Sequence, residues 1–392
     1  MIQELPDLAM QVEVVGCPTV CLHCWAMGRP YQAMPLEEIS WVLHEVRRFC
    51  TTHQLSFTGY PMHEVLAHPQ AGEVLVLFQQ LWEVAFDPLP TTGVPLATRP
   101  DWREILAPLR SYCVPMLWFA FHGTGEVHDC MVQRQGAYLE SLRAVALARQ
   151  AQVHTGCNLF LTSENVSHFD QLVADLLQAG MESIDPCIYG FTPNARGRLT
   201  ERVRPTWQEV QPILAQLDAL PVDDLVRRGW REEVHPESWF VQQALSGSWP
   251  AEPEKAEQRL IWLVCRPNLD VYRGDAGHYT RRYGNLRRDG VDDILNRALA
   301  DGACSHEELW FTPEQLLPVQ EVAARFGDQK SQRIHDAGSV RHWWLDCARR
   351  AGPMKQQPGR TSLNGSPFVG CRVHAGHEGR TTFSSRAWSR PS

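Results

Sequence analysis

The sequence predicts an α/β fold, and three observations lead to that class. From residue 10 onward, about 190 residues alternate six times between a short apolar run and an amphipathic helical stretch, as βα units on a parallel sheet do. One run, residues 115–121, is almost continuously apolar, as strands buried on both faces are. The 392 residues, 44% of them hydrophobic, are enough for a large core. A doubly wound sheet and a partial barrel both fit this pattern.

The six predicted strands are runs rich in apolar and β-branched residues, at 10–15, 55–59, 93–98, 115–121, 153–161 and 183–189. Helices are predicted between and after them where apolar residues recur at helical spacing, at 35–49, 71–86, 101–109, 136–151 and 169–179. In both candidate folds the functional residues lie on loops after the C-terminal ends of strands. Those loops are therefore where chemistry is expected.

The rest of the chain divides by composition. A helix is predicted at 208–220, a β-hairpin at 260–264 and 268–272, a helix at 291–300, and two more helices ending near residue 350. From residue 351 the chain is rich in Gly, Ser, Pro and Arg without periodicity, which predicts a disordered tail. The expected division is a core at 1–205, a helical linker at 206–257, a small α+β cap with C-terminal helices at 258–350, and the tail at 351–392.

Three cysteines follow the first predicted strand with the spacing C-x3-C-x2-C: Cys17, Cys21 and Cys24. Thiolates are the usual ligands of iron–sulfur clusters. A cubic cluster has four irons, so three protein ligands would leave one iron open to bind a small molecule. Gly16 before the motif and the Gly-Arg-Pro sequence at 28–30 favour a loop.

Three other interpretations of this motif remain open at this point. The cysteines stand at i, i+4 and i+7, so on a helix they would share one buried face. Zinc could use His23 or a distant residue as its fourth ligand, but no second C-x2-C pair closes such a site. A redox pair of Cys21 and Cys24 would leave Cys17 without a role.

Charge and composition exclude several classes of partner. The net charge is −8, the pI is near 6.1 and no long basic run occurs, which argues against a nucleic acid partner. No apolar stretch approaches the ~20 residues that span a bilayer, so no membrane contact is expected. The first residues include Glu4 and Asp7 without a basic region, unlike a secretory signal. Twelve cysteines without such a signal indicate reduced thiols and a cytoplasmic protein.

The cysteine spacing, placed after the first strand of six, resembles the radical S-adenosylmethionine (radical SAM) enzymes. The resemblance covers about residues 10–205 and implies a partial (β/α)6 TIM-like barrel. It also implies that Cys17, Cys21 and Cys24 bind a [4Fe–4S] cluster whose free iron chelates S-adenosylmethionine (SAM). In that family the segment after the second strand, Gly-Gly-Glu-Pro, holds the amino group of SAM. Here the matching stretch begins at Thr58-Gly59 and lacks the second Gly and the adjacent Glu.

The resemblance makes the backbone carbonyls of Gly59 and Tyr60 the first candidates for SAM binding, and Glu64 the second. His23 stands where relatives usually have an aromatic residue near the adenine. Among residues after later strands, it suggests Asn158, Asn165 and Arg196 as cofactor contacts and His122, His128 and Asp129 as catalytic candidates. Each has a structural alternative: a helix-capping Asp with a surface His, a strand-end amide bonded to backbone, or an ordinary surface Arg.

The hairpin at 260–272 followed by Gly284-Asn285-Leu286 and a helix resembles the SPASM or twitch extension, which carries auxiliary clusters. Where that extension has a cysteine, this chain has Gly274, and Cys265 stands alone. We therefore expect a cluster-free cap that helps to bind substrate.

The resemblance implies a radical SAM enzyme that cleaves SAM reductively to a 5′-deoxyadenosyl radical and abstracts hydrogen from a substrate. The favoured substrate is a small molecule of specialised, natural product metabolism; a ribosomal peptide is the alternative. A flavodoxin or ferredoxin would supply the electron. The rival from another class is a non-catalytic or zinc-stabilised binding protein on the same barrel, supported by the degraded Gly-Gly-Glu segment.

Overall fold

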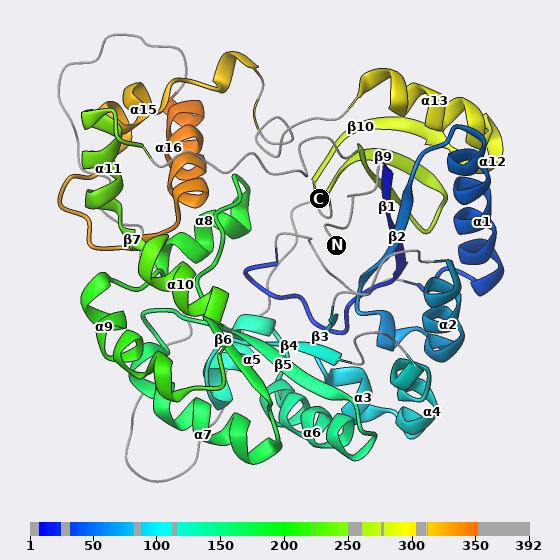
Figure 1. Cartoon of the computed structure of the whole chain (residues 1–392), viewed down its shortest axis with the longest axis horizontal. Helices are drawn as coiled ribbons and strands as arrows, with labels where there is room; N and C mark the ends of the chain where they lie inside the picture. The colour runs from blue at the N-terminus through cyan, green and yellow to red at the C-terminus, as the bar shows by residue number, and fades with distance from the viewer. Residues whose placement is uncertain are drawn as a thin grey trace, which may run out of the picture. The chain divides into compact units, whose positions relative to one another are not determined.

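The computed structural model describes residues 8–24, 32–81, 88–111, 116–222, 224–249, 261–275, 278–302, 311 and 313–351 (Figure 1). The predicted tail lies outside the described residues from residue 352 on. Contacts within the chain group residues 1–355 into one compact unit, and the description that follows concerns that unit.

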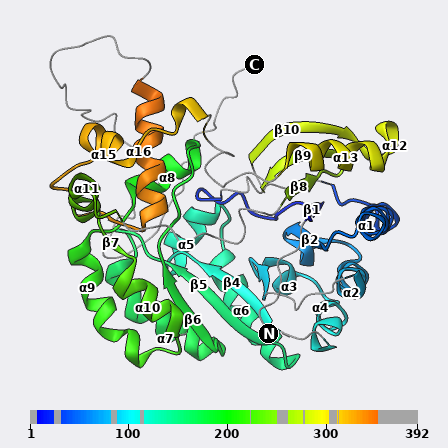
Figure 2. The same cartoon turned by 45° about the horizontal axis from the view of Figure 1, so that its top comes forward.

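Six parallel strands follow one another in chain order, as predicted. They are β1 (Leu8–Val15), β2 (Phe57–His63), β3 (Leu89–Thr91), β4 (Met116–Phe121), β5 (His154–Phe160) and β6 (Ser183–Cys187). β1 pairs with β2, and β3 to β6 pair in order in a second sheet, every pairing parallel. Figure 2 shows the helices on the outer side of these strands. The predicted α/β partial-barrel class is confirmed.

The helices between the strands alternate with them: α1 (Leu36–Thr52), α2 (Ala71–Leu81), α3 (Val94–Thr98), α4 (Trp102–Leu106), α5 (Gly125–Val132), α6 (Ala137–Gln150), α7 (Phe169–Ala179) and α8 (Ala195–Arg202). In α1 the buried residues recur every three or four positions, from Ile39 through Leu43 and Val46 to Phe49, which places one face on the sheet. On β1 alternate residues, such as Met10 and Val12, join the same hydrophobic core.

The third strand differs from its prediction. Residues 93–98 were expected as a strand, but β3 lies earlier and Val94–Thr98 is helix α3. Gly93 has a φ of +78°, and Pro95 occupies the first turn, a position where its missing N–H costs nothing. A five-residue apolar run cannot be assigned to strand or helix by periodicity alone.

The second strand is longer than predicted. Its expected end was Gly59, but β2 stays paired with β1 up to His63, with Pro61 opposite Val12. In the described sheet β2 is an edge strand, where a proline without an N–H is tolerated. The loop after β2 therefore begins at Glu64.

The predicted hairpin forms and joins the barrel sheet. β8 (Ile261–Cys265) and β9 (Asp270–Asp275) are antiparallel, β10 (His278–Asn285) adds to β9, and α12 (Leu286–Asp289) and α13 (Val291–Asp301) follow. β8 pairs in parallel with β1, giving the order β10-β9-β8-β1-β2. Since the expected cap shares a sheet with the expected core, the division of the chain at 205 and 257 stays a prediction.

Helices α11 (Glu237–Ser246), α15 (Val319–Phe326) and α16 (Ala337–Ala351) form a second hydrophobic cluster, which includes Phe240, Val322 and Trp344. Helices α9 (Trp207–Gln216) and α10 (Asp224–Glu232) pack into the first core through Val210, Ile213 and Trp230. A short antiparallel pair joins β7 (His235–Pro236) to β11 (Ile334–His335). The two predicted C-terminal helices are α15 and α16. No helix in the described ranges is long and apolar enough to cross a membrane.

Candidate active site

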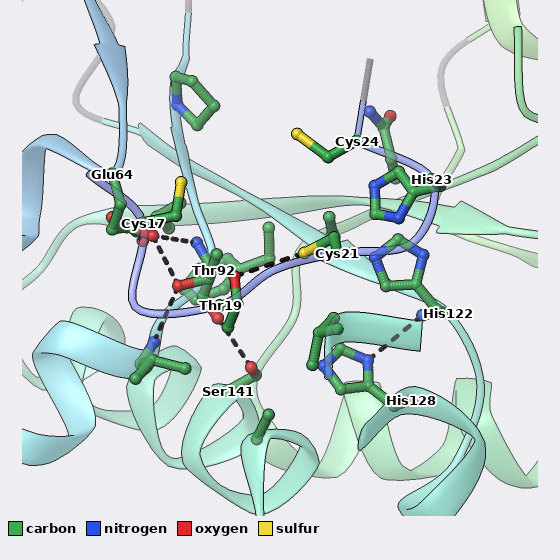
Figure 3. Close-up of a pocket in the computed structure, with 18 of the residues that line it drawn as sticks. Cys17, Thr19, Cys21, His23, Cys24, Glu64, Thr92, His122, His128 and Ser141 are labelled. Carbon is green, nitrogen blue, oxygen red and sulfur yellow. Dashed lines mark hydrogen bonds between the residues drawn. The ribbon is translucent and has the colours of Figure 1, made fainter. Parts of the chain in front are cut away.

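A cavity of about 270 Å³ lies where the C-terminal ends of β1 to β5 meet (Figure 3). Its walls come from the cysteine loop, from the ends of β2 to β5, and from α3, α5 and α6. The predicted site residues that line it are Cys17, Cys21, Cys24, Glu64, His122, His128 and Asn158. The structure thus brings together residues from the cysteine loop, the ends of β2, β4 and β5, and helix α5, as the parallel fold requires.

The cysteines lie on a loop and not on a helix, as predicted. Two backbone N–H groups of the loop donate to the last carbonyls of α5: Val20 to Val132 at 3.2 Å and Leu22 to Met131 at 2.8 Å. The N–H of Cys24 donates to the carbonyl of Cys21 at 3.2 Å and closes a turn. The loop is therefore fixed on the side that faces α5.

The three thiols line one cavity but do not meet at one point. Figure 3 shows their sulfur atoms at separate places around it. Among the residues that the structure describes, no three His, Cys, Asp or Glu side chains are close enough to hold a single metal ion. Three separated thiols on one cavity fit a cluster in which each sulfur binds a different iron.

Burial governs the protonation of these thiols. It raises the pKa of Cys21 to about 11. It also raises the pKa of Cys17, where the nearby charge of Glu64 acts in the same direction. Both are thus neutral thiols until a cation replaces the proton, which is how metal binding couples to thiol ionisation.

Glu64 lies in the cavity wall at the end of β2 and is buried. Its carboxylate accepts hydrogen bonds from the N–H of Thr92 at 2.5 Å and from the hydroxyls of Thr92 at 2.6 Å and Thr91 at 2.9 Å. Burial raises the pKa of Glu64, and these hydrogen bonds oppose the rise. Thr91 ends β3 and Thr92 follows it; neither was predicted, because only the fold brings them to Glu64.

Gly59 and Tyr60 are not among the residues that line the cavity. A Cβ built on Gly59 would lie 2.9 Å from Leu43 of α1 and 3.6 Å from Phe78 of α2, so this glycine faces the outer helices. The Tyr60 ring stacks on Trp262 of β8 at 6.1 Å between centroids. Their role as SAM contacts stays a prediction.

Three histidines form one end of the cavity. The His23 and His122 rings lie 4.2 Å apart, and the backbone N–H of His122 donates to Nδ1 of His128 at 3.3 Å. Nδ1 of His122 is hydrogen-bonded to the Tyr189 hydroxyl at 2.8 Å, and the His122 ring stacks on Phe160 at 5.1 Å. Burial lowers the pKa of His23 to about 3 and of His128 to about 4, so both rings are neutral near pH 7.

Two of the predicted site residues, Asp129 and Asn165, make hydrogen bonds to the backbone. Asp129 accepts hydrogen bonds from the N–H groups of Gly136 and Tyr138 at the start of α6. The Asn165 amide donates to the carbonyls of His122 and Phe160. Neither belongs to the cavity lining, so Asp129 and Asn165 shape the loops that carry the histidines.

His63 also lines the cavity and was not predicted as a site residue. It has a left-handed backbone, with a φ of +65°, and its Nε2 lies 3.7 Å from the buried carboxylate of Glu13. That carboxylate also accepts a hydrogen bond from the Tyr279 hydroxyl and lies 3.5 Å from Nε of Arg266. Burial would raise the pKa of Glu13, but the hydrogen bonds from His63 and Tyr279 outweigh it and lower the pKa.

Arg196 was expected to contact the cofactor, which stays a prediction; it is not among the residues that line the cavity. Its Nη1 donates to the backbone carbonyls of Cys21 at 2.9 Å and Cys24 at 3.4 Å. Arg198, on the same helix, pairs with Asp346 of α16 at 3.3 Å.

No model of a known protein family and no curated protein sequence matches the chain. Solved structures with a similar chain trace include anSMEcpe with bound AdoMet and Cp18Cys peptide, at 11% identity and a TM-score of 0.48, covering 88% of this chain and 97% of that one. Another is SuiB of Streptococcus suis bound to precursor peptide SuiA, at 10% identity and a TM-score of 0.48, covering 87% and 71%. A third is the coproporphyrinogen III oxidase HemN from Escherichia coli, described as a radical SAM enzyme, at 11% identity and a TM-score of 0.39, covering 88% and 90%. At such low identities and scores the function has to be inferred from the residues of the site.

Proposed function

We propose that this protein is a radical SAM enzyme in which Cys17, Cys21 and Cys24 bind a [4Fe–4S] cluster. One observation carries the proposal: all three thiols of the C-x3-C-x2-C loop line a single cavity at the C-terminal ends of the parallel strands. Because the three cysteines lie on a loop, they do not share a buried face of a helix. A zinc ion needs its ligands around one point, and no three His, Cys, Asp or Glu side chains among the described residues are arranged in that way. An iron–sulfur cluster, in which each thiolate binds its own iron, fits the separated thiols better.

The same cavity offers groups that suit SAM. At the end of β2, Glu64 presents a buried carboxylate, which would accept hydrogen bonds from the methionyl ammonium group. The rings of His23, His122, Phe160 and Tyr189 lie 4.2–6.0 Å apart in one cluster, an arrangement on which a flat adenine would stack. Asn158 of β5 also lines the cavity and would donate or accept a hydrogen bond.

The cluster and SAM, when bound, would supply a 5′-deoxyadenosyl radical that removes hydrogen from an unactivated carbon. The chain's own contribution is to position atoms and to exclude water. Buried apolar residues in the cavity wall, Val94, Phe119, Val132 and Ala137, keep the site dry. The neutral histidines add no positive charge next to the thiolates.

We further propose a small-molecule substrate of specialised metabolism, with a ribosomal peptide as the alternative, and an electron donor of the flavodoxin or ferredoxin type in the cytoplasm. The site is equipped for a substrate near His63, which lines the cavity and whose Nε2 lies 3.7 Å from the buried carboxylate of Glu13. A non-catalytic or zinc-stabilised protein is the competing function, and the first experiment separates the two.

Anaerobic reconstitution with iron and sulfide tests the proposal. We expect about four irons per chain, and 5′-deoxyadenosine when dithionite and SAM are added. Cys21→Ala should abolish SAM cleavage, because one cluster ligand is gone. The matched control is Cys347→Ala on α16, a cysteine outside the cavity, which should behave like the wild type. Stoichiometric zinc without iron–sulfur absorption in the wild type would show that the proposal is wrong.

A second prediction concerns the β8–β10 region. Since Gly274 stands where the related extension has a ligand cysteine, the triple variant Cys17→Ala, Cys21→Ala, Cys24→Ala should bind no iron–sulfur cluster. Iron and sulfide analysis of the reconstituted triple variant checks this. Four irons retained there would reveal an auxiliary cluster elsewhere in the chain.

A further inference from the structure

Arg196 connects the cysteine loop to a helix that lies far away in the sequence. The loop comes directly after β1, whereas Arg196 lies on α8 after β6. Its Nη1 donates to the carbonyl of Cys21 at 2.9 Å and to that of Cys24 at 3.4 Å. These two carbonyls bound the turn that carries the second and third thiols. The loop is thus held by α5 through Val20 and Leu22 on one side and by Arg196 on the other.

The backbone on both sides of Arg196, at the start of α8, is held by specific contacts. The side chain of Asn194 accepts a hydrogen bond from the N–H of Gly197 at 2.9 Å and caps the helix. A Cβ at Gly197 would lie 1.9 Å from the carbonyl oxygen of Thr192, so only glycine fits this close approach. Arg196, between the capping residue and this glycine, therefore has little freedom at its backbone.

The charge of Arg196 reaches the site. Its Nη1 lies 2.9 Å from the carbonyl oxygen of Cys21 and 3.4 Å from that of Cys24, and both cysteines line the cavity. Arg196 therefore brings a guanidinium group next to two of the three proposed cluster ligands.

We propose that Arg196 is a positioning residue that holds the cysteine loop and whose positive charge makes the bound cluster easier to reduce. This inference rests on the proposed function. A cluster held by three thiolates becomes more negative when it gains an electron, and in a buried site a fixed cation offsets that charge more strongly than water would allow. The guanidinium already has two loop carbonyls as partners, so it acts through the loop.

Hydrogen–deuterium exchange and a redox titration on the full chain test this inference. The variants are Arg196→Gln, which removes the charge, and Arg196→Lys, which keeps it. The matched control is Arg198→Gln, the same change two residues along α8, where the partner Asp346 retains Arg349 and Arg350. Exchange is measured on metal-free protein in peptides that cover residues 17–24. The midpoint potential is measured after reconstitution by titration followed by electron paramagnetic resonance.

We expect several-fold faster exchange of the loop in Arg196→Gln and a midpoint potential more negative than that of the wild type. Arg196→Lys should restore most of the potential, and Arg198→Gln should match the wild type in both measurements. Wild-type exchange or wild-type potential in Arg196→Gln would overturn the inference. If Arg196→Gln takes up no iron, Arg196→Met, which also lacks the positive charge, replaces it in the redox titration. A midpoint potential more negative than that of the wild type supports the electrostatic part, and a wild-type potential overturns it. If no chain takes up iron, the proposed function fails, while the exchange result still decides whether Arg196 holds the loop.

Discussion

At the scale of single residues, the site is built from groups whose ordinary charges are suppressed by burial. Cys21 has its pKa raised to about 11 and His128 has its pKa lowered to about 4. His122 is fully enclosed and its pKa is lowered well below the usual range. These groups are therefore neutral near pH 7, although the cavity is expected to bind a charged cluster and SAM. Keeping them neutral makes the free energy of unfolding depend on pH.

The pH dependence of stability should expose His128. Unfolded, this histidine takes up a proton near pH 6.5; folded, it does so only near pH 4. Between these two pH values only the unfolded state binds the proton, so the free energy of unfolding falls by about 1.4 kcal/mol for each pH unit of acidification. Above pH 6.5 neither state is protonated and the stability associated with this histidine is fully present. Urea unfolding between pH 7 and 4.5 should show a shallower decline in His128→Gln than in the wild type. His53→Gln, at an exposed position, should leave the decline unchanged; equal slopes in all three proteins would contradict the prediction.

At the scale of elements, the length of β2 decides what the residues after it can do. Because β2 runs to His63, the first residue beyond the strand is Glu64, and Gly59 lies within the strand against α1 and α2. The glycine is thus required by packing between sheet and helices.

Gly59→Ala should therefore lower stability without lowering the affinity for SAM in the protein that remains folded. The new Cβ would lie 2.9 Å from Leu43, and overpacking of this kind costs about 1–3 kcal/mol. The matched control is Gly229→Ala on α10, where a Cβ meets nothing within 4 Å; it should stabilise by about 0.5–1 kcal/mol. Thermal unfolding and calorimetric SAM titration measure the two effects. The prediction would be contradicted if Gly59→Ala had normal stability but no longer bound SAM. That result would mean that SAM lies against β2.

Most of the strands and several of the residues that line the cavity could be predicted from the sequence. The features that could not be predicted have physical causes. The cysteine loop, Glu64, His122, His128 and Asn158 reach the cavity because parallel strands gather their C-terminal ends. The end of β2 was missed because Gly59 and Pro61 read as a turn, whereas pairing with β1 overrides that local signal. Asp129 and Asn165 bind backbone groups outside the cavity lining, because a polar side chain after a strand serves a cap or a turn as readily as a ligand; their functional roles stay predictions. His63 and Thr92 carry no local signal at all.

At the scale of the whole molecule, the hairpin after residue 260 is part of the barrel sheet. β8 lies next to β1, and Leu263 of β8 is fully buried in the same core as Leu117 of β4. A cap built on a shared sheet should not unfold independently.

Leu263→Ala and Leu117→Ala should therefore weaken the same cooperative unit, each by about 2–5 kcal/mol. Hydrogen exchange near the unfolding transition can follow residues 116–121 and 261–285 separately in each variant. We expect both segments to lose protection together in both proteins. If Leu263→Ala exposed only the second segment, the division predicted at residue 257 would be correct and the cap would be a separate domain.

The pairing of β1 with β8 also determines when the sheet can be completed on the ribosome. Between the two strands lie about 250 residues, and translation at about 5–20 residues per second needs roughly 10–50 s to produce them. During that interval the nascent chain carries β1 with one edge unpaired, and Ala9, Met10 and Val12 stand opposite no partner on that side. Unpaired apolar edges are templates for association with other chains. Yield of folded protein in a heterologous host should thus rise with faster translation or with chaperones that shield the N-terminal strand.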